Sequence, residues 1–157
     1  VDLAMVAFFN GLASLAVYKL QDRAAISSRR KLLSGARRSM RYLQFLSNHS
    51  PQNALGLLKL LEAESFATSG KRHRKVVQGF RIACALCADR SFALGIGIGH
   101  EQWARYLMGR VSDQDQWEEH VRKAHTTYRE WGALVKVEQL SEEFPLLEEA
   151  KSRTRGS

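Results

Sequence analysis

The fold follows from two stretches that match when aligned end to end: LEAESFATSGKRHRKVVQGFRIACALC at 61–87 and QWARYLMGRVSDQDQWEEHVRKAHTTY at 102–128. In this repeat alignment, small and apolar residues coincide in the same order. The matched pairs are Ala63 with Ala104, Phe66 with Leu107, Val76 with Trp117, Phe80 with Val121, Ala83 with Ala124 and Cys87 with Tyr128. Apolar spacings of three and four on both sides of a turn predict a helical hairpin in each stretch. Such hairpins bury their apolar faces only against neighbours, so the match predicts a stack of hairpins, the alternative being a chance likeness of two amphipathic helix pairs.

The same periodicity continues along the rest of the chain, and only two prolines interrupt it. It predicts an all-α fold, an α-solenoid fragment of about seven helices in stacked antiparallel hairpins. The expected ranges are 2–19, 27–46, 51–68, 71–88, 91–109, 113–131 and 133–143. Residues that favour helix ends mark the expected boundaries. These are Ser27 or Ser28, Ser50 and Ser112 or Asp113 as N-caps, Pro51 as a first helical residue, and Gly70 after a helix end.

The apolar stripes predict which side of the first two helices is buried. In the first helix the stripe consists of Phe8, Leu12 and Leu15, with Phe9 and Ala16 as further candidates. In the second helix, apolar residues from Leu32 to Leu46 fall on one side and arginines on the other. Trp131 is also expected to take part in the packing between hairpins.

The chain is expected to form one domain over residues 1–150, followed by a polar tail at 151–157. Residues 1–20 are apolar but lack a basic leader and include Asp2 and Asn10. They are therefore expected to form a helix that is neither a signal peptide nor a membrane span. Since the chain begins inside a helical pattern, it is interpreted as part of a longer protein.

Charge is distributed unevenly along the chain. Residues 19–81 hold 14 Lys/Arg and 3 Asp/Glu, whereas residues 82–157 hold 10 and 12. The basic half predicts a surface that docks onto an acidic protein or is simply solvated, with nucleic acid and an anionic membrane as alternatives. The candidate docking residues are Arg30, Arg37, Arg38, Arg41, Lys71, Arg72, Arg74 and Lys75. The aromatic residues Tyr42 and Phe45 are expected to be partly committed to packing.

Two cysteines, Cys84 and Cys87, are spaced as a CxxC and so lie on one face of a helix. A redox CxxC would need a strand-to-helix context, and a zinc site would need two more ligands at matching spacing. The pair is therefore expected to be reduced and packed, which suits the cytoplasm or another reducing compartment.

Other combinations of residues do not predict an enzyme, a cofactor or a metal site. The run from Gly95 to Gly99 lacks the spacing and the preceding strand of a dinucleotide loop, so it is interpreted as a helix whose glycines allow close packing. His100-Glu101 is half of a zincin motif, but Ala104 stands where the second histidine would be. His120 and His125 are five apart and diverge on a helix. No nucleophile has a recognisable base nearby in the sequence.

Several motifs together resemble one family. The run from Tyr128 to Ala133 contains Tyr-x-x-Trp-Gly-Ala, and Phe144-Pro145 follows it. Leu61-Glu62-Ala63-Glu64 and the basic segment 29–41 add further likeness upstream. Over about residues 5–147 the chain resembles the tetratricopeptide-like region of large multidomain signalling ATPases and histidine or serine/threonine kinases.

This resemblance implies a TPR-like, non-catalytic scaffold between an ATPase and an output domain. The expected function is protein–protein interaction in signal transduction, with neighbouring domains or an acidic protein as partner. Two other functions remain open: a basic module that binds nucleic acid or a membrane surface, and a structural subunit of a larger assembly. The first would show affinity that falls steeply with salt.

Overall fold

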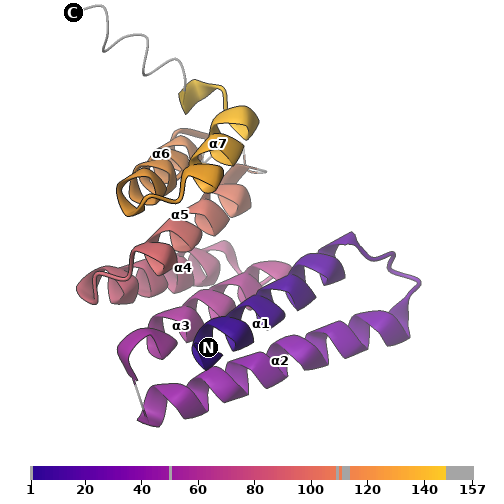
Figure 1. Cartoon of the computed structure of the whole chain (residues 1–157). Helices are drawn as coiled ribbons and strands as arrows, with labels where there is room; N and C mark the ends of the chain where they lie inside the picture. Colours follow the sequence, from indigo (N-terminus) through magenta and orange to yellow (C-terminus); the bar gives the residue numbers. More distant parts are fainter. Residues whose placement is uncertain (1, 50, 109, 111–113, 148–157) are drawn as a thin grey trace, which may run out of the picture. The chain divides into compact units, whose positions relative to one another are not determined.

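The computed structural model describes residues 2–49, 51–108, 110 and 114–147, which form seven α-helices and no strand. The predicted all-α class with about seven helices is confirmed (Figure 1). The helices are α1 (Leu3–Leu20), α2 (Ile26–His49), α3 (Pro51–Thr68), α4 (His73–Asp89), α5 (Ala93–Met108), α6 (Gln114–Trp131) and α7 (Leu134–Glu143).

The chain divides into two compact units within the range that the sequence assigns to one domain. Unit 1 is Val1–Phe92 and contains α1 to α4, and unit 2 is Ala93–Ser157 and contains α5 to α7. In unit 1, α1 packs against α2 and α3, and α3 also packs against α2 and α4. In unit 2, α5 packs against α6, and α6 against α7.

Helix ends follow the local sequence in most places. Pro51 is the first residue of α3, and Gly70 follows its end with φ of +66°. The Lys71 amide then donates to the Phe66 carbonyl (3.0 Å), which satisfies one of the free carbonyls of the last turn. The expected caps Ser50, Ser112 and Asp113 lie outside the described residues.

The expected start of α2 was wrong. Helix α2 begins at Ile26, so Ser27 and Ser28 lie in its first turn and are not the N-cap. The turn before it is held by Asp22, whose side chain accepts from the Ala24 amide (3.1 Å) and whose carbonyl accepts from Ala25 (3.0 Å). The helix also continues past the expected end, as far as His49.

The repeat alignment is visible in the backbone at the ends of α4 and α6. Ser91 and Gly132, which occupy equivalent positions in it, both have positive φ, 51° and 84°. The next amides close the same kind of loop: Phe92 donates to the Cys87 carbonyl (2.9 Å) and Ala133 to the Tyr128 carbonyl (2.8 Å). Both helices therefore end in the same backbone motif.

Two glycines also correspond in the repeat alignment, and both make room for the matched side chain. A Cβ on Gly56 would lie 2.8 Å from Cys87 Sγ, and one on Gly97 would lie 2.4 Å from the Tyr128 ring. The larger Tyr128 thus occupies in unit 2 the place that Cys87 occupies in unit 1. The expected close contact at the glycine run is confirmed at Gly97.

The cores of the two units contain most of the residues expected to pack between hairpins. The buried ones are Ala63, Val76, Phe80, Ala83, Ala104, Leu107, Val121, Ala124 and Tyr128. Phe66 and Trp117 are half-buried. Trp131 is 53% exposed, so its expected packing was wrong: α6 ends there, and Gly132 turns the chain before the side chain meets a neighbour.

The buried side of α1 also differs from the expected stripe. Phe8 and Leu15 are buried, but Leu12 is half-buried and Phe9 and Ala16 are exposed. The reason is Gly11, where a Cβ would lie 2.4 Å from Leu61 Cδ2, so that α3 approaches α1 on the Gly11 side.

The expectation that this segment is too polar to span a membrane was also wrong, because α1 is long and apolar enough to do so by length and composition.

Candidate interaction surfaces

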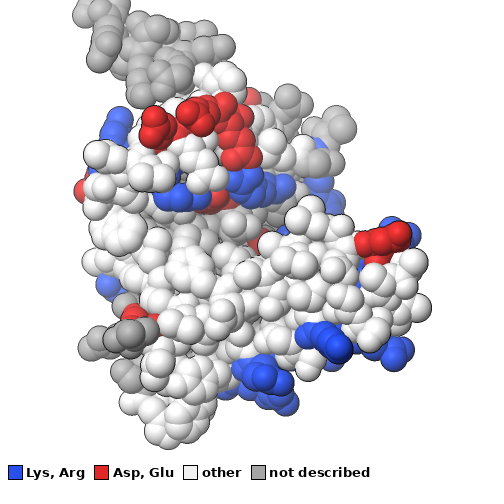
Figure 2. Space-filling model, turned by 45° about the vertical axis from the view of Figure 1, so that its right-hand side comes forward, with Lys and Arg blue, Asp and Glu red and all other residues white. Residues whose placement is uncertain are grey.

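The surface of unit 1 is dominated by the cations of α2. This 24-residue helix contains no Asp or Glu, and it turns Ala36, Ser39, Leu43 and Ser47 toward the core. Arg30, Arg37, Arg38 and Arg41 are exposed on the other side, as the sequence predicted, and we call them the arginine stripe. Figure 2 shows Lys and Arg along the edge of the molecule that α2 forms.

Arg29, next to the stripe, has a structural role. Its Nη1 donates to the carbonyls of Gln21 (2.9 Å) and Tyr18 (3.4 Å), and its guanidinium lies 3.9 Å from the centre of the Tyr18 ring. Arg29 therefore closes the turn between α1 and α2, and it is not available to a partner.

The arginine stripe lacks acidic neighbours in unit 1. The unit holds 15 Lys/Arg and only 5 Asp/Glu, an excess of ten positive charges. Glu64 pairs with Lys19 (2.9 Å) and Glu62 with Lys59 (2.8 Å), and no ion pair joins the stripe to a carboxylate among the described residues. The repulsion between the arginines of the stripe is therefore offset only by solvent ions or by a negatively charged partner.

Tyr42 and Phe45 lie beside the stripe and are more exposed than the sequence suggested. Tyr42 is 40% exposed and Phe45 55%, and their rings stack with centres 6.4 Å apart. His49 continues the row, 4.3 Å from the Phe45 ring. The outer side of α2 therefore offers both cations and aromatic faces.

A second basic cluster surrounds the start of α4. Lys71, Arg72, Arg74 and Lys75 are all exposed. Lys75 Nζ lies 4.4 Å from the Phe66 ring centre, and Arg72 makes no side-chain cap. Positive charges at a helix N-terminus oppose the helix dipole, so an anionic group here would relieve an unfavourable field.

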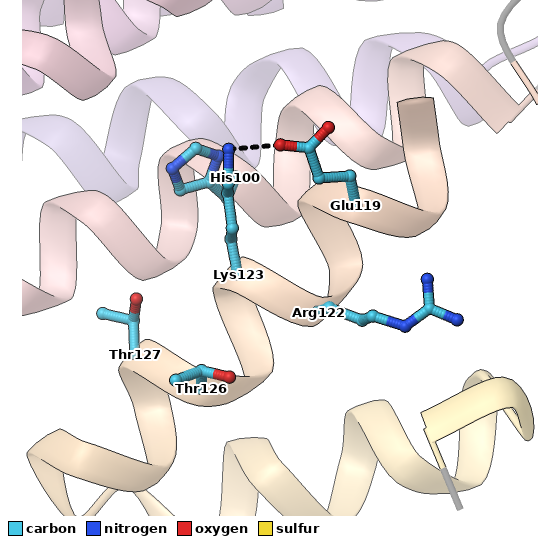
Figure 3. A pocket seen from close by; sticks show the side chains of 6 residues that line it. All are labelled: His100, Glu119, Arg122, Lys123, Thr126 and Thr127. Atoms are coloured by element: carbon cyan, nitrogen blue, oxygen red, sulfur yellow. Dashed lines mark ion pairs between the residues drawn. The ribbon is translucent and has the colours of Figure 1, made fainter. Parts of the chain in front are cut away.

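Unit 2 contains an open pocket of about 430 Å³, lined by His100 of α5 and by Glu119, Arg122, Lys123, Thr126 and Thr127 of α6 (Figure 3). Its cations already have partners. Lys123 pairs with Glu119 (2.6 Å), the contact drawn in Figure 3, and Arg122 with Glu118 (3.4 Å). An anionic ligand would have to break these pairs, so the pocket is a weak anion site.

A histidine pair lies beside this pocket. His100 Nδ1 and His120 Nδ1 are 2.9 Å apart, and the Trp103 ring stacks on His120 with centres 3.8 Å apart. Burial lowers the pKa of both imidazoles to about 4, with His120 and Lys123 also lowering that of His100 and Lys123 lowering that of His120. Both rings are therefore neutral near pH 7, one donating and the other accepting the shared proton. Sequence spacing missed this pair because its members are distant in the sequence and meet only across facing helices.

Glu101 is the polar centre of unit 2 and is only 6% exposed. The Tyr128 hydroxyl donates to it (2.9 Å), Lys136 Nζ lies 2.9 Å from it and Arg105 Nη2 3.1 Å. Arg105 also donates to Glu143 (2.8 Å), and this contact holds the pKa of the Glu143 carboxyl below its usual range. Burial, and then Glu101, raise the pKa of Tyr128. This network joins α7 to the α5–α6 hairpin, so Glu101 has a structural role in this arrangement.

The two cysteines are free and buried. Burial raises the pKa of Cys87 to about 11, so the reactive thiolate is scarce at neutral pH. In the part of the chain that the structure describes, no group of three or more His, Cys, Asp or Glu could hold a metal ion.

Comparisons of the chain with protein-family models, with curated proteins and with solved structures give no match. The Trp131-Gly132-Ala133 motif, which carries the family resemblance, forms the turn between α6 and α7. The kinship with signalling ATPases and kinases therefore stays a prediction from sequence motifs.

Proposed function

We propose that this chain is a non-catalytic protein-interaction scaffold whose arginine stripe docks onto an acidic surface of a partner protein. The observation that carries the proposal is the stripe itself, four exposed arginines on a helix without a carboxylate. From Arg30 to Arg41 it extends over about 17 Å, given a rise of about 1.5 Å per residue. Guanidinium groups bind carboxylates in a two-point geometry, which favours an acidic protein surface.

The hairpin repeat supports the scaffold part of the proposal. The cap at Ser91 recurs at Gly132, and the close approach at Gly56 recurs at Gly97, as expected for a TPR-like helical repeat. Stacked repeats form extended surfaces that bind proteins without chemistry of their own. Together with the sequence motifs, the repeat supports the proposal that this chain is a piece of a larger signalling ATPase or kinase, acting in the cytoplasm or another reducing compartment.

A charge-reversal experiment tests the docking surface. The variant Arg37→Glu/Arg41→Glu is compared with Arg81→Glu/Arg90→Glu, which makes the same charge change at exposed positions of unit 1 away from the stripe. Surface substitutions of this kind change stability by about 0.5 kcal/mol or less, so both variants should fold. Each is used for affinity capture from an extract treated with nuclease and detergent.

The wild type and the control variant should capture the same specific proteins, and the stripe variant should fail to capture them. Equal capture by all three chains would show that the stripe is not the docking face.

The exposed aromatics support one other function. Tyr42 and Phe45 beside Arg41 suit a polyanion with flat or apolar parts, such as single-stranded nucleic acid or an anionic membrane. Gel shifts with single-stranded oligonucleotides and sedimentation with phosphatidylserine vesicles, each at about 50 and 200 mM salt, would detect it. Tight binding that falls steeply with salt, and is lost in the stripe variant, would favour this function over protein docking.

A further inference from the structure

Helix α1 presents an apolar face that nothing in unit 1 covers. The large exposed side chains recur at helical spacing over 18 residues, a length of about 27 Å. They are Leu3, Val6, Phe9, Val17 and Leu20, which we call the head face. Leu20 is 86% exposed and the others 43–54%. Figure 2 shows an uncharged surface over this part of unit 1, with Lys and Arg along the edge formed by α2.

The opposite side of α1 already packs against another helix. There α3 packs closely, with Leu61 against Gly11. The head face has a similar relief, because the small exposed residues Ala13 and Ala16 lie between Phe9 and Leu20. A ridge with a shallow notch fits the side chains of another helix.

Unit 2 carries a second exposed apolar patch, of opposite charge character. Trp131, Leu134 and Val135 are 53%, 68% and 79% exposed at the junction of α6 and α7. Glu138 and Glu142 are exposed on the same side of α7, while Lys136, the one basic residue of α7, is held by Glu101. We call these five exposed residues, Trp131, Leu134, Val135, Glu138 and Glu142, the tail face.

We propose that the tail face of one copy of this chain packs onto the head face of another. The apolar residues of α7 would cover α1, and Glu138 and Glu142 would meet the arginine stripe beside it. Charge selects this pairing, because two head faces together would oppose two arginine stripes, whereas head and tail bring opposite charges together. The contact joins two different surfaces, so copies associate head to tail and the average mass rises with concentration.

The experiment measures mass by sedimentation velocity for the whole chain from about 5 to 500 µM. The head variant is Val6→Glu/Leu20→Glu, the tail variant is Leu134→Glu/Val135→Glu, and Ile82→Glu is the matched control. Ile82 is 41% exposed in unit 1 and belongs to neither face. Circular dichroism checks folding. Leu20→Glu alone replaces the head variant, and Val135→Glu alone the tail variant, if the double variant unfolds, because these side chains are the most exposed.

The wild type and the control should exceed the monomer mass of 17.8 kDa progressively, while each variant alone stays a monomer. An equimolar mixture of head and tail variants should form a dimer and no larger species. The intact tail face of the head variant binds the intact head face of the tail variant, and both faces left free are mutated. A monomeric wild type, association of a variant alone, or a mixture that stays monomeric would overturn the proposal. Binding of phosphatidylserine vesicles through the head face, without self-association, would overturn it in favour of a membrane.

This inference goes beyond the proposed scaffold function and is tested separately from it. Partner capture depends on Arg37 and Arg41, whereas the head and tail variants leave every arginine in place. A wild type that stays a monomer but captures proteins through Arg37 and Arg41 would overturn self-association alone. A wild type that self-associates, with equal capture by the stripe variant, would overturn the scaffold proposal alone.

Discussion

At the scale of single residues, Gly97 shows most clearly how unit 2 is packed. Inside a solvent-exposed helix, a Gly→Ala substitution raises the free energy of unfolding by about 1 kcal/mol. At Gly97 the new methyl would meet the Tyr128 ring at 2.4 Å, and that ring is held by its hydrogen bond to Glu101. Since overpacking costs about 1–3 kcal/mol, Gly97→Ala should lower the free energy of unfolding by about 1 kcal/mol in urea titrations.

Gly35→Ala is the matched control for this prediction. It lies inside α2, where the nearest atom to a new Cβ is the Ser14 hydroxyl at 3.2 Å, at the end of a side chain that can rotate. This substitution should leave stability unchanged or raise it. Equal effects at the two glycines would contradict the packing argument.

A second prediction at this scale concerns Glu101. Glu101→Gln removes the charge that Arg105 and Lys136 share, and both cations lie about one-third exposed. Hydrogen bonds to charged groups contribute about 1.5–3 kcal/mol, and partial exposure reduces this, so the loss should be about 2 kcal/mol. Tyr128→Phe removes a single hydrogen bond to the same carboxylate and should cost about 1 kcal/mol. Urea unfolding measures both, and a larger loss for Tyr128→Phe would contradict the central role of the charge.

The histidine pair predicts how stability depends on pH. Each imidazole has a pKa of about 4 when folded and about 6.5 when unfolded, so the unfolded chain binds more protons between these values. Stability from this pair is complete above pH 6.5 and is lost as the pH falls toward 4. The slope is about 1.4 kcal/mol per pH unit for each proton by which the two states differ.

The double variant His100→Gln/His120→Gln should flatten this slope in unfolding curves measured from about pH 7 to 4. His49→Gln is the control, since His49 is exposed on α2 and bonds only its own helix. A slope that the double variant leaves unchanged would assign the pH dependence to carboxylates.

At the scale of elements, the ends of α4 and α6 allow a reciprocal exchange. Ser91 adopts φ of 51°, which costs a residue with a Cβ about 1–2 kcal/mol, whereas glycine occupies the equivalent position 132. Ser91→Gly should therefore raise the free energy of unfolding by about 1 kcal/mol, and Gly132→Ser should lower it by about the same amount. Thermal unfolding measures both changes as shifts of the midpoint, upward for Ser91→Gly and downward for Gly132→Ser. Shifts of the same sign in the two variants would show that the ends are not equivalent.

The helices themselves could be predicted from the sequence because apolar spacing and strong turn residues agree. Pro51 and Gly70 mark both ends of α3. The start of α2 could not be found in this way, since Asp22 closes the turn through backbone contacts that compete with a serine cap.

The exposed side of α2 could also be predicted, because arginines and apolar residues alternate with helical period. The head face could not, since large apolar residues lie on every side of α1 and the side that α3 covers is set by the close approach of Leu61 to Gly11. The Glu101 network escaped prediction as well. Its members come from three helices, and in the sequence Glu101, Arg105, Lys136 and Glu143 look like ordinary surface charges.

At the scale of the whole molecule, charge and stability are divided between the units. Unit 1 carries ten excess positive charges, whereas unit 2 holds 9 Lys/Arg and 11 Asp/Glu. Added salt screens the repulsion in unit 1 and should slow amide hydrogen exchange in α2 more than in α5 and α6. Lowering the pH from about 6.5 to 4.5 should instead reduce protection mainly in α5 and α6, where the histidines lie, when each exchange rate is divided by the intrinsic amide rate at the same pH. Equal responses of both units would contradict this division.

The burial of Cys84 and Cys87 has a practical consequence. Both thiols belong to unit 1, while all three tryptophans, Trp103, Trp117 and Trp131, belong to unit 2. A maleimide can reach the thiols only when unit 1 opens, and indole fluorescence reports only on unit 2. The thiols therefore report on the unfolding of unit 1 and the tryptophans on that of unit 2. Following thiol modification and tryptophan fluorescence in one heated sample would show whether the units unfold together or one after the other.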